Sequence, residues 1–303
     1  MSARLELFRE QSWFFEGMMA EIEARGNLIG LSIQGIPIQV SSSHAKILSW
    51  IEEYFSDFKT SSLFGTKIHF DWQENHPYLQ GEGSDEFHEF DDRHIEFGLH
   101  RDFFAKKLKT GDWKVLLGKE WEDGIHNFHR FLFSELLLDV DSLLIHASGG
   151  FYMDSGFVFL GPSGAGKSTT ISNLVESEPK VTSLGDDVLI IEKNNSWDQV
   201  FVNSAPFGSG ETKEPPVSEQ IPLKGIYRLK QSDTNRSFSI EPARQCVELI
   251  GSAMGRAHRQ TRNRQLHLAS SILENLWRKN VNLKELELTC SADFWPVVME
   301  DIL

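Results

Sequence analysis

The residues best suited to chemistry lie in one glycine-rich segment. Residues 161–168 read Gly-Pro-Ser-Gly-Ala-Gly-Lys-Ser and satisfy the pattern G-x-x-x-x-G-K-[ST] in full. Glycines let backbone N–H groups converge on phosphate oxygens, and the start of a helix adds positive potential there. In this pattern Lys167 neutralises the β- and γ-phosphates, and Ser168 offers its hydroxyl to Mg²⁺. We therefore expect a nucleoside triphosphate to bind with Mg²⁺ through Gly161, Ser163, Gly164, Ala165, Gly166, Lys167, Ser168 and Thr169.

Two adjacent carboxylates follow this segment. Asp186 and Asp187 come after Gly185 and directly before the apolar run 188–191. Adjacent side chains at the edge of a strand point in different directions, so the two aspartates can take different roles. One can hold Mg²⁺, and the other can accept the proton of an attacking hydroxyl. A plain polar turn is the structural alternative.

The surrounding pattern supplies the elements that must position these groups. The apolar run 157–160 predicts a strand leading into the glycine loop, and residues 169–175 predict a helix after it. Residues 188–191 predict a second buried strand. Residues 143–148 predict another strand, with His146 near its end. A lone histidine there is usually a satisfied core residue.

The leading part predicts a separate small α+β domain, residues 1–118, which shows no chemistry and could recognise a substrate or partner. A strand pair is expected over residues 27–40, then a helix capped by Ser43 that buries Ile47 and Ile51. Residues 67–70, 95–99 and 113–117 predict short strands. The domain that follows, residues 119–303, opens with a helix over residues 124–140 that is apolar on several sides.

Three later segments allow both a functional and a structural interpretation. Residues 206–211 could close over the phosphates, with Glu211 near the metal, or form a β-turn. The basic run 255–264 could contact the phosphoryl group, but a solvated helix face with ion-pair partners is the preferred interpretation. Phe294 and Trp295, near the end of the chain, are expected to pack in the core.

The composition excludes several classes of function. The net charge of −14 argues against broad nucleic-acid binding, because that field repels phosphate backbones. The chain shows no secretory signal pattern and no apolar run of the roughly 20 residues that span a bilayer. Cys246 and Cys290 are expected to be reduced thiols. We expect a cytoplasmic protein without a nucleic-acid or membrane partner, and a homo-oligomer is left open.

Three stretches together resemble a known family. Residues 143–150 (LLIHASGG), the glycine loop and residues 184–192 (LGDDVLIIE) occur in the order and spacing of the HPr serine kinase/phosphorylase catalytic domain. The resemblance covers about residues 119–230. It is greatest to the HPr kinase-related proteins found beside peptide-modification clusters, some of which phosphorylate a serine of a precursor peptide. Departures from the HPr enzymes include Pro162 and Thr169, where those enzymes usually carry acidic residues.

The resemblance implies an α/β fold of the phosphoenolpyruvate carboxykinase-like P-loop type. It also implies an ATP- and Mg²⁺-dependent kinase that acts on a serine (or threonine) hydroxyl of a peptide or small protein. By position, Asp186 matches the catalytic aspartate, Asp187 its metal-associated neighbour, and His146 a histidine that would orient Asp186. Two alternatives are a regulatory ATP-binding protein without catalysis and a kinase of a small metabolite such as free serine.

Overall fold

The computed structural model describes residues 28–76, 79, 88–92, 95–196, 198–208, 220–255, 259–289 and 291–303. The chain divides into two compact units, Met1–Ile125 and His126–Leu303. The division falls inside helix α4 (Trp121–Leu136), whereas the sequence places a boundary before this helix, at residue 118. The roles expected for the two domains stay predictions.

The described part of the first unit is a mixed sheet with a helix and a short 3-10 turn. Its strands follow the order β3-β1-β2-β4-β8-β7-β6-β5. The predicted strand pair and the three predicted short strands are all present in this sheet. The bounds are β1 Ile29–Ile33, β2 Ile36–Ser42, α3 Ala45–Tyr54, η1 Ser56–Phe58, β3 Lys59–Thr60, β4 Thr66–Trp72, β5 His88–Asp92, β6 Ile95–Leu99, β7 Phe103–Lys107 and β8 Trp113–Leu117.

Local sequence explains the first turn and the first helix. Gln34 and Gly35 join β1 to β2 with φ of 51° and 73°, the left-handed pair that suits a tight hairpin. The residue at the N-cap of α3 is His44 and not Ser43, so the predicted cap is wrong. The Ser43 hydroxyl instead lies 3.2 Å from Nε2 of His69, which diverts it from the helix end. Ile47 and Ile51 of the helix are buried as expected.

The second unit is built on a sheet with the order β12-β10-β11-β15-β14-β13-β9, and β17 pairs with both β15 and β16. Strands β11, β15 and β17 run parallel to one another. The bounds are η2 Leu137–Val140, β9 Ser142–His146, β10 Ser148–Tyr152, β11 Ser155–Leu160, α5 Lys167–Ser177, β12 Val181–Gly185, β13 Val188–Asn194, β14 Gln199–Ser204, β15 Ile221–Gln231, β16 Arg236–Ser239, α6 Pro242–Ser252, α7 Arg259–Arg278, β17 Leu283–Leu288, η3 Ala292–Phe294 and α8 Trp295–Ile302.

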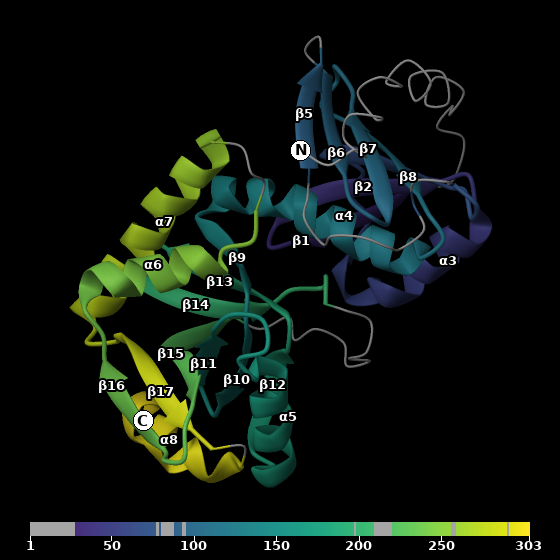
Figure 1. Cartoon of the computed structure of the whole chain (residues 1–303). Coiled ribbons are helices and arrows are strands. Elements are labelled where there is room, and N and C mark those ends of the chain that lie inside the picture. Colours follow the sequence, from purple (N-terminus) through teal and green to yellow (C-terminus); the bar gives the residue numbers. More distant parts are fainter. Residues whose placement is uncertain are drawn as a thin grey trace. The chain divides into compact units, whose positions relative to one another are not determined.

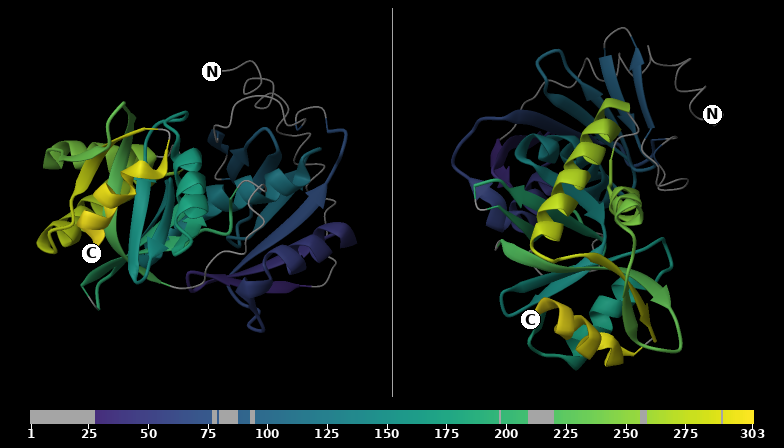
Figure 2. Two further views of the ribbon diagram at one scale, coloured as in Figure 1. Left: turned by 90° about the horizontal axis from the view of Figure 1, so that it is seen from below. Right: turned by 90° about the vertical axis from the view of Figure 1, so that its left-hand side faces the viewer.

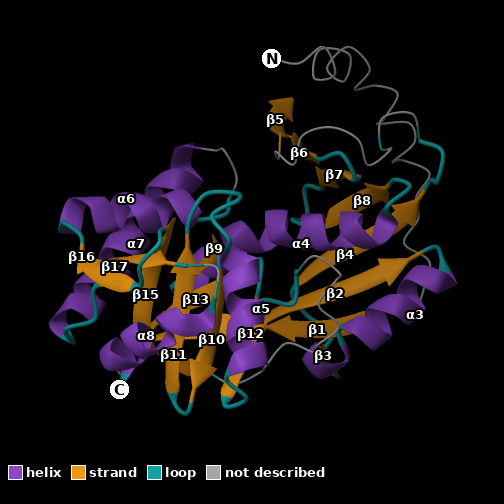
Figure 3. Ribbon diagram, turned by 60° about the horizontal axis from the view of Figure 1, so that its bottom comes forward, coloured by secondary structure: helices purple, strands orange, loops and turns teal. Residues whose placement is uncertain are grey.

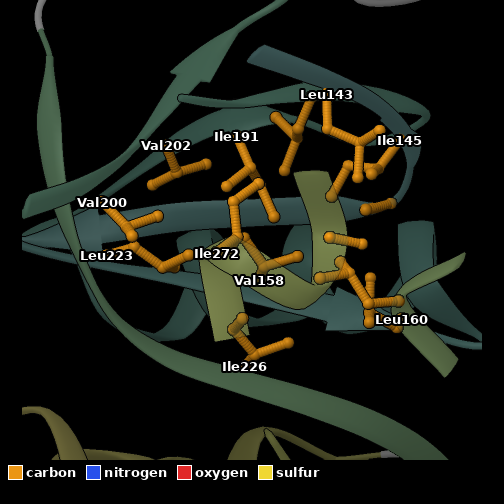
Figure 4. Close-up of a cluster of buried hydrophobic side chains, with 14 of the residues drawn as sticks. Leu143, Ile145, Val158, Leu160, Ile191, Val200, Val202, Leu223, Ile226 and Ile272 are labelled. Carbon is orange, nitrogen blue, oxygen red and sulfur yellow. The ribbon is translucent and has the colours of Figure 1, made fainter. Parts of the chain in front are cut away.

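Helices cover both faces of this sheet (Figures 1, 2 and 3): α6 and α7 lie on one face, and α5 and α8 on the other. The alternation of side chains along β11 explains both layers, because successive residues point to opposite faces. Val158 and Leu160 join the core under α7, where Figure 4 shows them with Ile272. Phe157 and Phe159 join the core under α5 and α8.

The end of the chain closes the second of these cores. Phe294 is fully buried and Trp295 is 2% exposed, which confirms the prediction that both residues pack. They contact the rings of Phe159 and Phe157 of β11, respectively. Within the described residues, none of the helices is both long and apolar enough to cross a membrane.

Candidate functional site

The glycine loop joins the end of β11 to the start of α5, as the sequence predicts. A Cβ on Gly161 would lie 2.8 Å from the Cβ of Ala165, so the loop can fold back on itself only with glycine there. Gly164 has a φ of 78° and open space where a Cβ would be. The Ala165 N–H donates to the Pro162 carbonyl at 3.1 Å and closes the turn. Ser163, Gly164, Ser168 and Thr169 are exposed, so this stretch of the loop and of the first helical turn is accessible.

Lys167 folds back over the loop. Its ammonium group donates to the carbonyls of Gly161 at 2.9 Å and Pro162 at 3.3 Å, and the residue is only 6% exposed. Burial lowers the pKa of Lys167, and the negative charge of Asp187 opposes that shift. The Ser148 hydroxyl donates to the Lys167 carbonyl at 2.8 Å and ties the first turn of α5 to β10. The lysine is therefore positioned at the centre of the loop by the loop itself.

The aspartate pair lies next to the end of the loop. Ser168 donates its hydroxyl to the Asp186 carbonyl at 3.0 Å, across 18 residues of sequence. Gly185, at the end of β12, has a φ of 155°, and a Cβ there would lie 3.1 Å from the Val188 carbonyl. This backbone conformation turns the chain sharply from β12 into the two aspartates. Loop and aspartates therefore belong to one site.

His146 contacts Asp187 and not Asp186, so the expected partner of this histidine is wrong. The antiparallel register of β9 and β13 places His146 opposite Val188, the residue after Asp187. Nδ1 of His146 lies 3.0 Å from Oδ1 of Asp187, and the Ala147 N–H donates to the Asp187 carbonyl at 3.1 Å. The strand pairing thus fixes both the backbone and the carboxylate of Asp187.

Arg130 completes the site and was not expected from the sequence. It lies on α4, and its Nη2 is 2.6 Å from Oδ2 of Asp187. Its Nε donates to the Phe207 carbonyl at 2.6 Å, which fixes the guanidinium group from a second direction. Phe207 in turn stacks on His129 of the same helix. The sequence around Arg130 carries no signal of this contact.

The environment of Asp187 stabilises its charged form. Burial alone would raise the pKa of this carboxyl group, but the hydrogen bond from His146 and the charge of Arg130 outweigh it, so the pKa is lowered. The Asp187 and Arg130 side chains are only 21% and 14% exposed, so solvent screens the pair weakly. Asp187 is therefore a fixed negative charge beside Lys167.

Two other expectations concern the basic run and residues 206–211. Arg262 donates to the Ala253 carbonyl and the Gln265 side chain, and Arg264 forms an ion pair with Asp139, so both contact their own unit. This arrangement favours the structural interpretation for these two arginines. Residues 256–258 and Glu211 lie outside the described residues.

Comparison with known proteins gives a family match and matches among solved structures. No curated protein matches the sequence. The structure of the HPr(Ser) kinase/phosphatase from Coxiella burnetii matches at 15% identity and a TM-score of 0.25, over 45% of this chain and 97% of that chain. A match at this level is no argument for a shared activity. The model of the family described as "SynChlorMet cassette protein ScmC" matches residues 132–303, which include His146, the glycine loop and both aspartates. Because that match covers more than half of the sequence, the chain belongs to the SynChlorMet cassette protein ScmC family.

Proposed function

We propose that the protein is an ATP- and Mg²⁺-dependent kinase that transfers the γ-phosphate to a serine or threonine hydroxyl of a peptide or small protein. The observation that carries the proposal is the hydrogen bond from Ser168 to the Asp186 carbonyl, which joins the phosphate loop to the aspartate pair. The parallel strands β11, β15 and β17 on which the loop stands support a P-loop arrangement. We assign this unit to the phosphoenolpyruvate carboxykinase-like type as part of the proposal.

The loop has the shape and charge to hold phosphates. Gly164 is exposed and a Cβ there would meet nothing within 4 Å, so a phosphate can approach the backbone closely. The first turn of α5 adds its unpaired N–H groups and the positive end of the helix dipole. Lys167 already points at the loop and needs only to exchange its carbonyl partners for phosphate oxygens.

The donor set fits Mg²⁺. Ser168 and Asp187 supply hard oxygen atoms, the ligands that this ion prefers. Mg²⁺ is usually held by one or two carboxylates together with substrate phosphates. When bound, the ion would neutralise the charge that develops on the transferring phosphoryl group.

We assign different roles to the two aspartates. Asp187, held by Arg130 and His146 with a lowered pKa, is a weak proton acceptor and suits the role of metal-associated anion. Asp186 is then the carboxylate that accepts the proton of the acceptor hydroxyl. The hydroxyl oxygen bonds to the γ-phosphorus as the bond to the β–γ bridging oxygen breaks. ADP leaves with that electron pair, and the hydroxyl proton passes to Asp186.

His146 and Arg130 are positioning residues in this scheme. Each occupies a different oxygen of the Asp187 carboxylate, so together they set its orientation. A carboxylate offers about four lone-pair sites, so both contacts leave room for a metal. His146 therefore orients Asp187, and Asp186 remains the proposed proton acceptor.

The test is transfer of labelled γ-phosphate from ATP into the components of a lysate from the source organism. Wild type is compared with Asp186→Asn, which we expect to lose at least the roughly 10²–10⁴-fold that a general base contributes. A labelled protein, peptide or small molecule that depends on Asp186 supports a kinase and gives the size class of the acceptor. Equal labelling by the two proteins, with ATP binding intact in both, contradicts the proposal and favours a regulatory ATP-binding protein.

A further inference from the structure

A pocket of about 170 Å³ opens beside the phosphate loop. Part of its wall comes from the loop and helix α5, and part from the ends of two strands. The lining residues include Ala165, Thr169 and Asn173 on one side, and Gln231, Leu288 and Thr289 on the other. None of the groups in the aspartate site belongs to this wall.

The topology explains why a pocket forms there. Strands β11, β15 and β17 are parallel, so their carboxyl ends meet at one edge of the sheet. The loop follows β11, Gln231 is the last residue of β15, and Leu288 is the last residue of β17. In open α/β sheets, ligands bind in the crevice outside the carboxyl ends of the strands.

Helix α5 presents two different faces to its surroundings. Thr169 and Asn173 are four residues apart, share one face of the helix and line the pocket. Ser168, one residue earlier, points about 100° away around the helix and bonds to the Asp186 carbonyl. The first turn of α5 therefore separates the pocket from the aspartate pair.

The lining has the chemistry of a site for a flat polar ring and a sugar. Ala165 and Leu288 provide apolar surface, and the amides of Asn173 and Gln231 each carry donors and an acceptor. The Thr289 hydroxyl belongs to a network, 3.3 Å from Oδ1 of Asn235 and 2.8 Å from the Ser291 hydroxyl. Pockets that enclose a whole drug-sized ligand measure about 300–1,000 Å³, so this one fits only part of a nucleotide.

We infer that this pocket takes the base and ribose of the nucleoside triphosphate whose phosphates lie on the loop. The inference rests on the proposed function and adds to it the direction of the bound nucleotide. The nucleoside lies toward β15 and β17, and the γ-phosphate lies toward Ser168 and the aspartates. The acceptor hydroxyl therefore approaches from the side of β9 and β13.

The test separates the nucleoside from the phosphates by using two probes, Mg·ATP and Mg·tripolyphosphate, in isothermal titration calorimetry. Asn173→Phe fills the pocket from the helix, and Gln231→Ala removes an amide from the opposite wall. Ser172→Phe is the matched control, because Ser172 is the exposed neighbour of Asn173 and does not line the pocket. Thermal unfolding of each variant checks that it is folded.

We expect Asn173→Phe to weaken ATP binding at least tenfold and to leave tripolyphosphate binding within twofold of wild type. Gln231→Ala should weaken ATP binding by a smaller factor and should also leave tripolyphosphate binding within twofold of wild type. Ser172→Phe should change the affinity for neither ligand. Unchanged ATP affinity in both pocket variants, or an equal loss for both probes, overturns the assignment of the pocket. Failure of wild type to bind either probe overturns the proposed function itself, and the inference with it.

Discussion

The ion pair between Arg130 and Asp187 is predicted to be one of the strongest polar contacts of the second unit. The test is a double-mutant cycle with Arg130→Met, Asp187→Asn and the double variant, followed by urea unfolding. Arg130→Met also removes the hydrogen bond from Arg130 to the Phe207 carbonyl. That loss occurs both in wild type and in the Asp187→Asn background, so it cancels in the coupling energy. The coupling energy that remains reports the pair alone.

The magnitude follows from the geometry and the burial. At about 4 Å between charge centres and an effective dielectric constant of about 20, the attraction is roughly 4 kcal/mol. Desolvation of a pair that is 14% and 21% exposed offsets part of this, so we expect a coupling of about 2–3 kcal/mol. The control pair, Arg278 and Asp198, is 3.5 Å apart with side chains 61% and 59% exposed, and should couple by less than about 1 kcal/mol.

The same pair predicts a pH dependence with a definite sign. The pKa of Asp187 is lower in the folded state than in the unfolded state, so the folded protein holds fewer protons at this group. Its contribution to stability is therefore full above the usual carboxyl range and is lost as the pH falls through the lowered pKa. Wild type should lose more stability than Asp187→Asn on acidification below about pH 4.

A coupling energy below about 0.5 kcal/mol for Arg130 and Asp187 would refute this reasoning. So would a coupling equal to that of the exposed control pair, because burial would then have no effect. Either result would mean that Asp187 is not held as a fixed anion, and the division of roles between the two aspartates would lose its physical basis.

Three further predictions concern single residues. Gly164→Val should weaken ATP binding at least tenfold because a β-branched residue resists a φ of 78°. Gly111→Val is the control: at a φ of 88° it strains the backbone in the same way, but Gly111 lies outside the loop, so ATP binding should not change. His146→Ala should lower the rate of phosphate transfer about 10–100-fold, as loss of a supporting contact usually does, and should change the affinity for ATP little. A larger effect on the affinity than on the rate contradicts the positioning role. Tyr227→Phe should cost about 1–2 kcal/mol in urea unfolding, because the buried hydroxyl donates to Asp301 at 3.1 Å; no measurable cost would show that the bond is not formed.

The parts of the site that lie close together in sequence were predictable. The glycine loop and the strand and helix that flank it were read from one motif, because local backbone geometry determines their shape. The strands over residues 157–160 and 188–191 were predicted from runs of apolar residues, and both are present. The strand predicted over residues 143–148 ends at His146, because Ser148 already begins β10. Packing of Phe294 and Trp295 was also predictable, since large aromatic side chains contribute much of the apolar surface that a core buries.

The parts that depend on distant contacts were not predictable. Arg130 reaches Asp187 across 57 residues of sequence, and nothing in its own neighbourhood signals that contact. Which of the two adjacent aspartates His146 contacts depends on the register of β9 against β13, and a single sequence does not determine that register. The prediction that Ser43 caps the helix was wrong for a similar reason, because His69 on a neighbouring strand contacts the Ser43 hydroxyl.

The most direct test of the central claim is calorimetric titration of Mg·ATP into wild type, Lys167→Ala and Asp186→Asn. We expect wild type and Asp186→Asn to bind with similar affinity and Lys167→Ala to lose binding, because the lysine neutralises the phosphates and Asp186 acts only on the acceptor. Binding by Lys167→Ala at wild-type affinity would contradict the claim that the glycine loop holds the phosphates.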